Sequence, residues 1–240
     1  MPHFLISDNC IKNNTIEIND KELLSHLFQS LRIKKGEIIK FITKDEIVYK
    51  ALVQDISKKN LCAEILDSKK SERKLDINLC ALISILKPDA MHLAIENAVQ
   101  AGAREIYTVY SDNCAVKKGV VLNKIEKWQK IAYESFKQCE RADMPHLSRT
   151  SAFEEIFSKF KKENILIFAE KYDEFSIKSA CKKLDINEKI LCVFGPEGGF
   201  SEEEFKFFKE NCYMLVTLGK LIFKAPNAIT AGLFGVSQNV

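Results

Sequence analysis

The sequence predicts an α/β protein in two parts, a small β-barrel over residues 1–70 and a larger α/β domain over residues 75–240. Three observations support this division. Residues 37–66 contain short segments rich in Ile, Val and Phe, which are typical of strands. A polar stretch, SKKSERKLD, follows them and is the expected linker. From residue 75 onward, strand-like apolar runs alternate with helical patterns, which indicates a parallel sheet covered on both faces by helices.

The first part is expected to form a small antiparallel barrel, because its strands are short and joined by polar turns. The strands are predicted at residues 37–43, 47–55 and 61–66, with turns at residues 44–46 and 58–60. One helix is predicted over residues 21–28, where Leu23, Leu24 and Leu27 recur at helical spacing.

The second part begins with a nearly uncharged strand over residues 76–86 and a helix over residues 89–101. Gly102 is expected to end this helix, and the next strand to run from residue 105 to residue 110. Further helices are predicted over residues 122–139, 152–160 and 177–184 and from about residue 225 onward, and further strands over residues 164–169 and 190–194. Pro226 suits the first turn of the last helix, since its missing N–H would have no partner there.

The most informative stretch is LCVFGPEGGFSEEEF, residues 191–205. An apolar strand ends at Gly195, bare backbone follows at Gly198 and Gly199, and Ser201 with Glu204 forms a capping box that begins a helix. A strand, a glycine loop and a helix start in this order build a ligand site at the carboxyl end of a strand. The spacing matches neither GxGxxG nor GxxxxGK[ST], so it argues against a Rossmann or P-loop nucleotide site.

A second apolar run, YMLVTLGKLIFK at residues 213–224, is broken at Gly219. Together the two stretches resemble the cofactor-binding motifs of SPOUT methyltransferases, and GPEGGFS followed by LG-x-x-I-x-[RK] is similar to the RsmE-type family. The chain departs from that family at Leu221 and Lys224, where arginine is usual, and at Pro226, within a segment that is usually TET.

The resemblance implies an enzyme that methylates N3 of a uridine in 16S ribosomal RNA with S-adenosylmethionine. It also implies a PUA-like barrel, a trefoil knot in the carboxyl-terminal domain, and a homodimer in which Phe207, Phe208, Phe223 and Phe234 supply core or interface. The residues it assigns to the cofactor come from the two loops, where the amides of Leu218 and Ile222 would contact adenine: Phe194, Gly195, Pro196, Glu197, Gly198, Gly199, Leu218, Gly219, Leu221, Ile222 and Phe223.

Two further segments resemble the family and carry its expected RNA contacts. The HL-x-x-x-LR segment contains His26 and Arg32, of which Arg32 is the stronger candidate, since a histidine beside a helix often only packs there. The W-x-K-I pattern at Trp128 is followed by Lys130, Gln138 and Arg141. Glu134, Gln138 and Arg141 are spaced to share one helix face, which either forms a surface network or lines the active cleft.

The proposed chemistry needs a way to remove the weakly acidic proton of uridine N3. Cations near the base oxygens would stabilise the resulting anion, and Arg141 and Lys224 are the candidates. No histidine lies in the two glycine loops, which argues against a histidine base. Glu197 could act as the base, or it could be a loop carboxylate that accepts backbone amides.

Composition narrows the class of protein. Hydrophobic residues at 46% and charged residues at 29% describe a globular protein, and neither a membrane-length apolar run nor a signal peptide is present, so a cytoplasmic location without membrane contact is expected. The eight cysteines are scattered with no CxxC pair, which predicts structural thiols and no metal.

Positive charge is concentrated in two segments of the chain. Residues 1–74 carry 14 basic and 11 acidic groups, and residues 117–149 carry 8 basic and 4 acidic groups. This excess of positive charge indicates either solvated surface lysines or an RNA-binding surface in these segments.

Three functions stay open at this point. An N3-uridine methyltransferase explains both glycine loops, the helix face and the barrel. A SPOUT ribose 2′-O-methyltransferase fits the superfamily but not the GPEGGFS string or the barrel. A non-catalytic RNA-binding relative is consistent with the departures at Leu221, Lys224 and Pro226. Cofactor binding separates the third from the others, and base against ribose methylation separates the first two.

Overall fold

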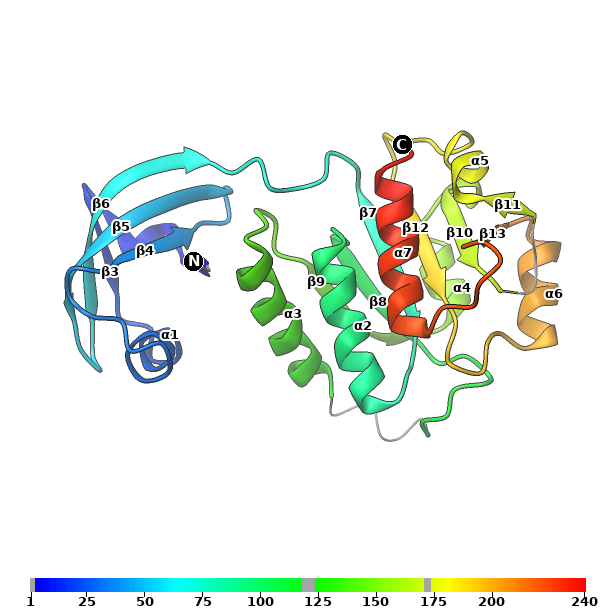
Figure 1. Cartoon of the computed structure of the whole chain (residues 1–240), viewed down its shortest axis with the longest axis horizontal. Coiled ribbons are helices and arrows are strands. Elements are labelled where there is room, and N and C mark those ends of the chain that lie inside the picture. Colours follow the sequence, from blue (N-terminus) through cyan, green and yellow to red (C-terminus); the bar gives the residue numbers. More distant parts are fainter. Residues whose placement is uncertain (1–2, 118–123, 171–173) are drawn as a thin grey trace. The chain divides into compact units, whose positions relative to one another are not determined.

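The structure is a computed structural model that describes residues 3–117, 124–170 and 174–240, and its elements are labelled in Figure 1. The chain divides into two compact units. The first contains residues 1–74 and 137–144, and the second contains residues 75–136 and 145–240. The first boundary falls where the polar linker is predicted. The sequence analysis assigned residues 137–144 to the second part, whereas in the structure they belong to the first unit.

The first unit contains a six-stranded sheet in the order β1-β4-β5-β6-β3-β2, curled as Figure 1 shows. Its strands are β1 (His3–Leu5), β2 (Ile11–Lys12), β3 (Thr15–Ile18), β4 (Ile38–Ile42), β5 (Ile47–Ile56) and β6 (Leu61–Lys70). The three predicted strands are confirmed as β4, β5 and β6, and their pairing is antiparallel as expected. The exception is β1, which the sequence analysis did not predict and which pairs with β4 in parallel.

The predicted helix of the first unit is confirmed in part. α1 (Lys21–Ser25) begins at Asp20, whose carboxylate accepts the backbone N–H of Leu23 at 2.8 Å. The helix then widens into a π-helical turn over His26–Ser30. Leu24 and Leu27 are fully buried and pack in one apolar cluster with Phe4, Ile16 and Phe41, so the helical spacing of the leucines does reflect burial against the sheet.

Ion pairs hold residues 137–144 within the first unit. The Glu140 carboxylate bonds Lys40 Nζ on β4 at 2.9 Å and Arg73 Nη1 at 2.9 Å. The Lys137 ammonium, which is buried, lies 3.5 Å from His26 Nε2 and 5.4 Å from the centre of the Phe4 ring. Two cations from the first 74 residues therefore form ion pairs with one carboxylate. The pattern of residues 122–139 could not predict these pairs.

The second unit contains a seven-stranded sheet in the order β11-β13-β10-β12-β7-β8-β9, in which every pair is parallel. Its strands are β7 (Leu79–Ser84), β8 (Glu105–Val109), β9 (His146–Ser151), β10 (Ile165–Phe168), β11 (Phe175–Ser176), β12 (Ile190–Phe194) and β13 (Met214–Thr217). All residues of β7, β10 and β12 are buried, as expected for strands with helices on both faces. The α/β prediction is confirmed.

The helices of this unit are α2 (Pro88–Gln100), α3 (Ile125–Cys139), α4 (Phe153–Phe157), α5 (Ile177–Cys181), α6 (Glu202–Glu210) and α7 (Ala225–Ser237) (Figure 1). α4 and α6 cover one face of the sheet, where Phe153, Phe157 and Phe208 form an aromatic core. α2 and α7 pack together and cover the other face. The predicted helix over residues 122–139 is confirmed from Ile125, since residues 122 and 123 lie outside the described part. Within the described residues, no helix is both long and apolar enough to cross a membrane.

A glycine of α7 determines how closely this helix approaches the sheet. The rings of Phe168 and Phe194, at the ends of β10 and β12, stack with centroids 4.9 Å apart. A Cβ placed on Gly232 would lie 2.7 Å from Phe194 Cε1 and 3.1 Å from Phe168 Cε1. Only a residue without a side chain allows this packing.

We therefore expect Gly232→Ala to destabilise the protein by about 1–3 kcal/mol, because the added methyl group overpacks two aromatic rings. Gly235→Ala is the matched control in the same helix. Its Cβ would meet only the flexible tip of Ile177, and alanine is favoured over glycine within a helix by up to about 1 kcal/mol. Thermal unfolding of both variants gives the comparison, and an equal loss in both would contradict the proposed packing.

Candidate active site

A pocket of about 770 Å³ lies at the carboxyl ends of β10, β12 and β13 in the second unit. Phe168, Phe194 and Thr217, the last residues of the three strands, all line it. Every residue that the sequence analysis assigned to the cofactor lines this pocket, and Lys224 does so as well. The structure thus brings the two glycine loops together, although Gly219 lies 20 positions after Gly199 in the chain.

The first glycine loop follows β12 and turns back on itself. Gly199 has φ +72°, a conformation that glycine adopts readily, and its N–H donates to the carbonyl oxygen of Pro196 at 2.9 Å. The ring of Phe200 packs against Gly195, where an added Cβ would lie 3.2 Å from the ring. The predicted capping box is present: Ser201 Oγ accepts the Glu204 N–H, and the Glu204 carboxylate accepts the Ser201 N–H.

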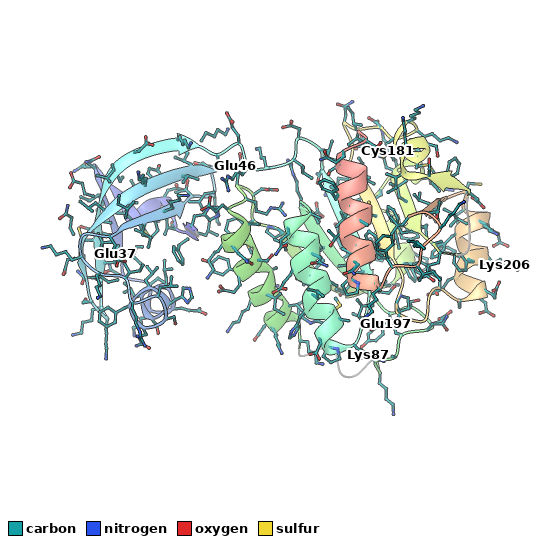
Figure 2. The ribbon with its side chains drawn as sticks, in the orientation of Figure 1. Glu37, Glu46, Lys87, Cys181, Glu197 and Lys206 are labelled. Atoms are coloured by element: carbon teal, nitrogen blue, oxygen red, sulfur yellow. The ribbon has the colours of Figure 1, made fainter. Side chains whose placement is uncertain are left out.

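Glu197 links this loop to the start of α2. Its Oε1 accepts the backbone N–H of Lys87, the N-cap residue of α2, at 3.0 Å (Figure 2). This bond matches the interpretation of Glu197 as a loop carboxylate that accepts a backbone amide. The side chain is exposed, and its other oxygen makes no hydrogen bond among the described residues.

The second glycine loop follows β13. Gly219 has φ +107°, and its N–H donates to Thr217 Oγ1 at 3.0 Å. Beyond it, Leu221 and Ile222 are 80% and 77% exposed, which is unusual for large apolar side chains that line a pocket. Lys224 is exposed and is the N-cap residue of α7, and Pro226 lies in the first turn of that helix, as predicted.

Several lining residues were missed by the sequence analysis. They come from the first turns of α2 and from the end of β10: Asp89, Ala90, Leu93, Ala169 and Glu170. Only the strand order could have indicated them, because it places β10 between β12 and β13 although both follow it in the chain. With Lys220 and Lys224, the carboxylates of Asp89, Glu170 and Glu197 give the pocket both signs of charge.

The predicted helix face that includes Arg141 is wrong. α3 ends at Cys139 and Glu140 has φ +53°, so Arg141 lies beyond the helix. Its side chain is buried, and the guanidinium binds the Asp143 carboxylate through two hydrogen bonds, of 3.1 and 2.7 Å. Arg141 belongs to the first unit, whereas the pocket lies within the second.

The other predicted RNA contacts are surface residues. Lys130, Glu134 and Gln138 are exposed on α3. Arg32 is exposed with φ +54°, and it follows Leu31, the C-cap residue of the π-helical turn. No group of three His, Cys, Asp or Glu side chains among the described residues is arranged to hold a metal ion.

Comparison with known proteins identifies the family. The family model described as an RNA methyltransferase domain matches residues 72–237, about two thirds of the chain. The chain belongs to this family. The model of an RNA methyltransferase PUA domain matches residues 18–66. The prediction of an RNA methyltransferase is confirmed by this membership.

Relatives of the family cover nearly the whole chain. The ribosomal RNA small subunit methyltransferase E 2 of Borreliella burgdorferi is 26% identical, over 97% of this chain and 95% of its own. The ribosomal RNA small subunit methyltransferase E of Bacillus subtilis is 25% identical, over 93% and 90%. Among solved structures, the Neisseria gonorrhoeae methyltransferase E bound to S-adenosyl methionine has a TM-score of 0.82 at 24% identity, covering 97% of this chain and 95% of that one. This likeness shows a shared fold.

Proposed function

We propose that this protein transfers a methyl group from S-adenosylmethionine to N3 of a uridine in 16S ribosomal RNA. The observation that carries the proposal is that the two glycine loops, GPEGG and LG-x-x-I, line the same pocket. Family membership supports RNA methylation, and relatives named as small-subunit ribosomal RNA methyltransferases support the substrate. Such a reaction on ribosomal RNA fits a cytoplasmic location.

The residues of the pocket fit S-adenosylmethionine. A volume of about 770 Å³ is within the usual range for a cofactor site. Apolar Leu218 and Leu221 suit a purine, and the open backbone around Gly219 can present N–H and C=O groups to its polar edge. The carboxylate of Asp89 suits the ammonium of the cofactor's amino-acid group.

The cofactor supplies an activated methyl group on its sulfonium, so the protein must hold it, aim it and manage the N3 proton. We assign stabilisation of the uracil anion chiefly to Lys224, because Asp143 already neutralises the Arg141 guanidinium. As RNA contacts we propose Arg32, Lys130 and Gln138, which are exposed, whereas Arg141 is buried. For Glu197 we propose two roles, in which Oε1 fixes the loop and the other oxygen accepts the proton.

The finer features of the fold are also part of the proposal. We propose that the first unit is a PUA-like RNA-binding barrel, with residues 1–70 as its main segment, which the PUA-domain match supports. We propose that residues 75–240 form a SPOUT domain with a carboxyl-terminal trefoil knot. The position of β10 between two later strands is consistent with such a path.

The reaction can be tested with small ribosomal subunits from a strain that lacks the gene. The purified protein and S-adenosylmethionine should add one methyl group to the base of a uridine, at N3, as mapped by mass spectrometry of nuclease fragments. Lys224→Met should slow this reaction by roughly 10–100-fold, because the base anion loses a cation. Lys182→Met, which removes an exposed lysine after α5, is the control and should keep full activity. Methylation of the ribose, or none, would refute the proposal.

The cofactor site can be tested through backbone strain alone. Gly219→Ala places a side chain at φ +107°, and Gly36→Ala does the same at φ +88° in the first unit. Apart from the adjacent residues in the chain, no described atom lies within 4 Å of either added Cβ, so both variants should lose a similar stability of about 1–2 kcal/mol. Only Gly219→Ala should weaken S-adenosylmethionine binding in calorimetry. Equal affinity in the two variants would place the cofactor elsewhere.

We propose that the protein is a homodimer whose second copy covers exposed apolar residues of the second unit. Phe208 is fully buried and Phe207 packs against the core, so neither serves an interface. Phe223 and Phe234 are 39% and 58% exposed and are the better candidates.

Sedimentation of the full chain should give the mass of two copies. Phe234→Glu should shift it toward one copy, because the substitution places a charge on the proposed interface. The matched control is Ile186→Glu, which alters an apolar residue of similar exposure, 52%, in the loop between α5 and β12. A monomeric wild-type protein with full activity would contradict the dimer.

A further inference from the structure

A loop far away in the sequence holds the first glycine loop in place. Residues 111–113 follow β8 and lie against residues 198–204, about ninety positions later in the chain. Hydrogen bonds join the two segments at several points: Ser111 Oγ to Glu204 Oε2 at 2.9 Å, Asp112 N to Glu204 Oε1 at 3.2 Å, Ser201 Oγ to Asp112 Oδ2 at 2.6 Å, and Asn113 Nδ2 to the carbonyl oxygen of Gly199 at 3.1 Å.

Glu204 is the centre of this arrangement. Its side chain is buried, yet no ammonium or guanidinium is bonded to it among the described residues. The carboxylate instead accepts three hydrogen bonds, from Ser201 N at 2.8 Å and from the two groups of residues 111 and 112. A buried carboxylate is tolerated when donors surround it in this way, and the N-terminus of α6 adds a favourable dipole. Its bonds join the helix start to the loop after β8.

Asn113 constrains the two adjacent glycines from outside the pocket. Its amide fixes the carbonyl of Gly199, the residue with φ +72°. Its Cβ and its own carbonyl oxygen are so close to Gly198 that a Cβ added there would lie 3.1 Å from each. The absence of a side chain at Gly198 therefore allows its close approach to this loop. Both glycines line the pocket, whereas Asn113 and Glu204 do not.

We propose that Asn113 and Glu204 are positioning residues that hold the glycine loop in its cofactor-binding shape before the cofactor arrives. This inference rests on the proposed function, since it assumes that the pocket binds S-adenosylmethionine. The physical reason is entropic: two consecutive glycines have the most backbone freedom to lose, and ties to a neighbouring loop reduce that loss at binding. We define these ties, made by residues 111–113 and Glu204, as the loop clamp.

Two near-isosteric substitutions test the loop clamp. Asn113→Asp keeps the shape but replaces the amide donor by a carboxylate that faces the Gly199 carbonyl. Glu204→Gln replaces one acceptor oxygen by a donor that faces an N–H or hydroxyl donor. We expect S-adenosylmethionine affinity, measured by calorimetry well below the unfolding temperature, to fall by about 3–10-fold in each. If Asn113 only fills space, Asn113→Asp binds like the wild type and Asn113→Ala does not.

Hydrogen exchange in the cofactor-free protein provides a readout that is independent of binding and activity. The amides of residues 198–201 should exchange faster in Asn113→Asp and Glu204→Gln than in the wild type. The matched control is Asn211→Ala at the opposite end of α6. This substitution removes the hydrogen bond that the Asn211 side-chain amide donates to the Phe207 carbonyl oxygen. It should change neither the affinity nor the exchange of residues 198–201, even if it lowers the unfolding temperature.

The outcomes separate this inference from the proposed function. A wild-type protein that does not bind S-adenosylmethionine refutes the proposed function, and exchange of residues 198–201 still decides whether the loop clamp orders the glycines. A wild-type protein that binds, with unchanged affinity and exchange in both clamp variants, overturns the inference alone. An equal loss of affinity in Asn211→Ala also overturns it, because the effect would then be general destabilisation.

Discussion

The parallel pairing of β10 with both β12 and β13 is the constraint on which the candidate site depends. Parallel strands end at the same edge of a sheet, so the loops that follow β12 and β13 must meet there. The stacked rings of Phe168 and Phe194 form the floor between them, and Gly232 lets α7 lie directly against those rings. The pocket is thus a consequence of strand order and of one glycine in a helix that carries no chemistry itself.

Local sequence patterns predicted much of the structure around the first glycine loop. The buried strand before Gly195, the capping box at Ser201 and the helix that follows are encoded within fifteen residues, and all of them are present. What could not be predicted involves partners distant in the chain. Nothing near Asn113 in the sequence indicates that its amide meets Gly199, and Glu204 appears in the sequence only as a capping residue.

The errors have equally specific causes. β9, HLSRTS, is too polar to be recognised as a strand. It lies at the edge of the sheet and pairs only with β8, and edge strands often carry polar side chains. The predicted helix over residues 122–139 ends where α3 does, so the error lies in extending its face by spacing to Arg141, two residues beyond Cys139. Glu140, the next residue, has φ +53°, and its carboxylate is bound by Lys40 and Arg73. The chain therefore leaves the helical conformation before Arg141, and residue spacing alone contains no information about that turn.

The two glycine loops differ in how they are stabilised, which suggests different roles. The first is tied to the loop after β8 by hydrogen bonds of the side chains of Asn113 and Glu204, so its shape is set within one chain. The second is bonded mainly to itself, through Thr217 and Gly219, and leaves Leu221 and Ile222 largely exposed. Covering exposed aliphatic side chains of this size lowers the free energy, by about 1.5–3 kcal/mol for each side chain when burial is complete. The first loop is therefore held by hydrogen bonds within the chain, whereas the free energy of the second falls when its exposed side chains are covered.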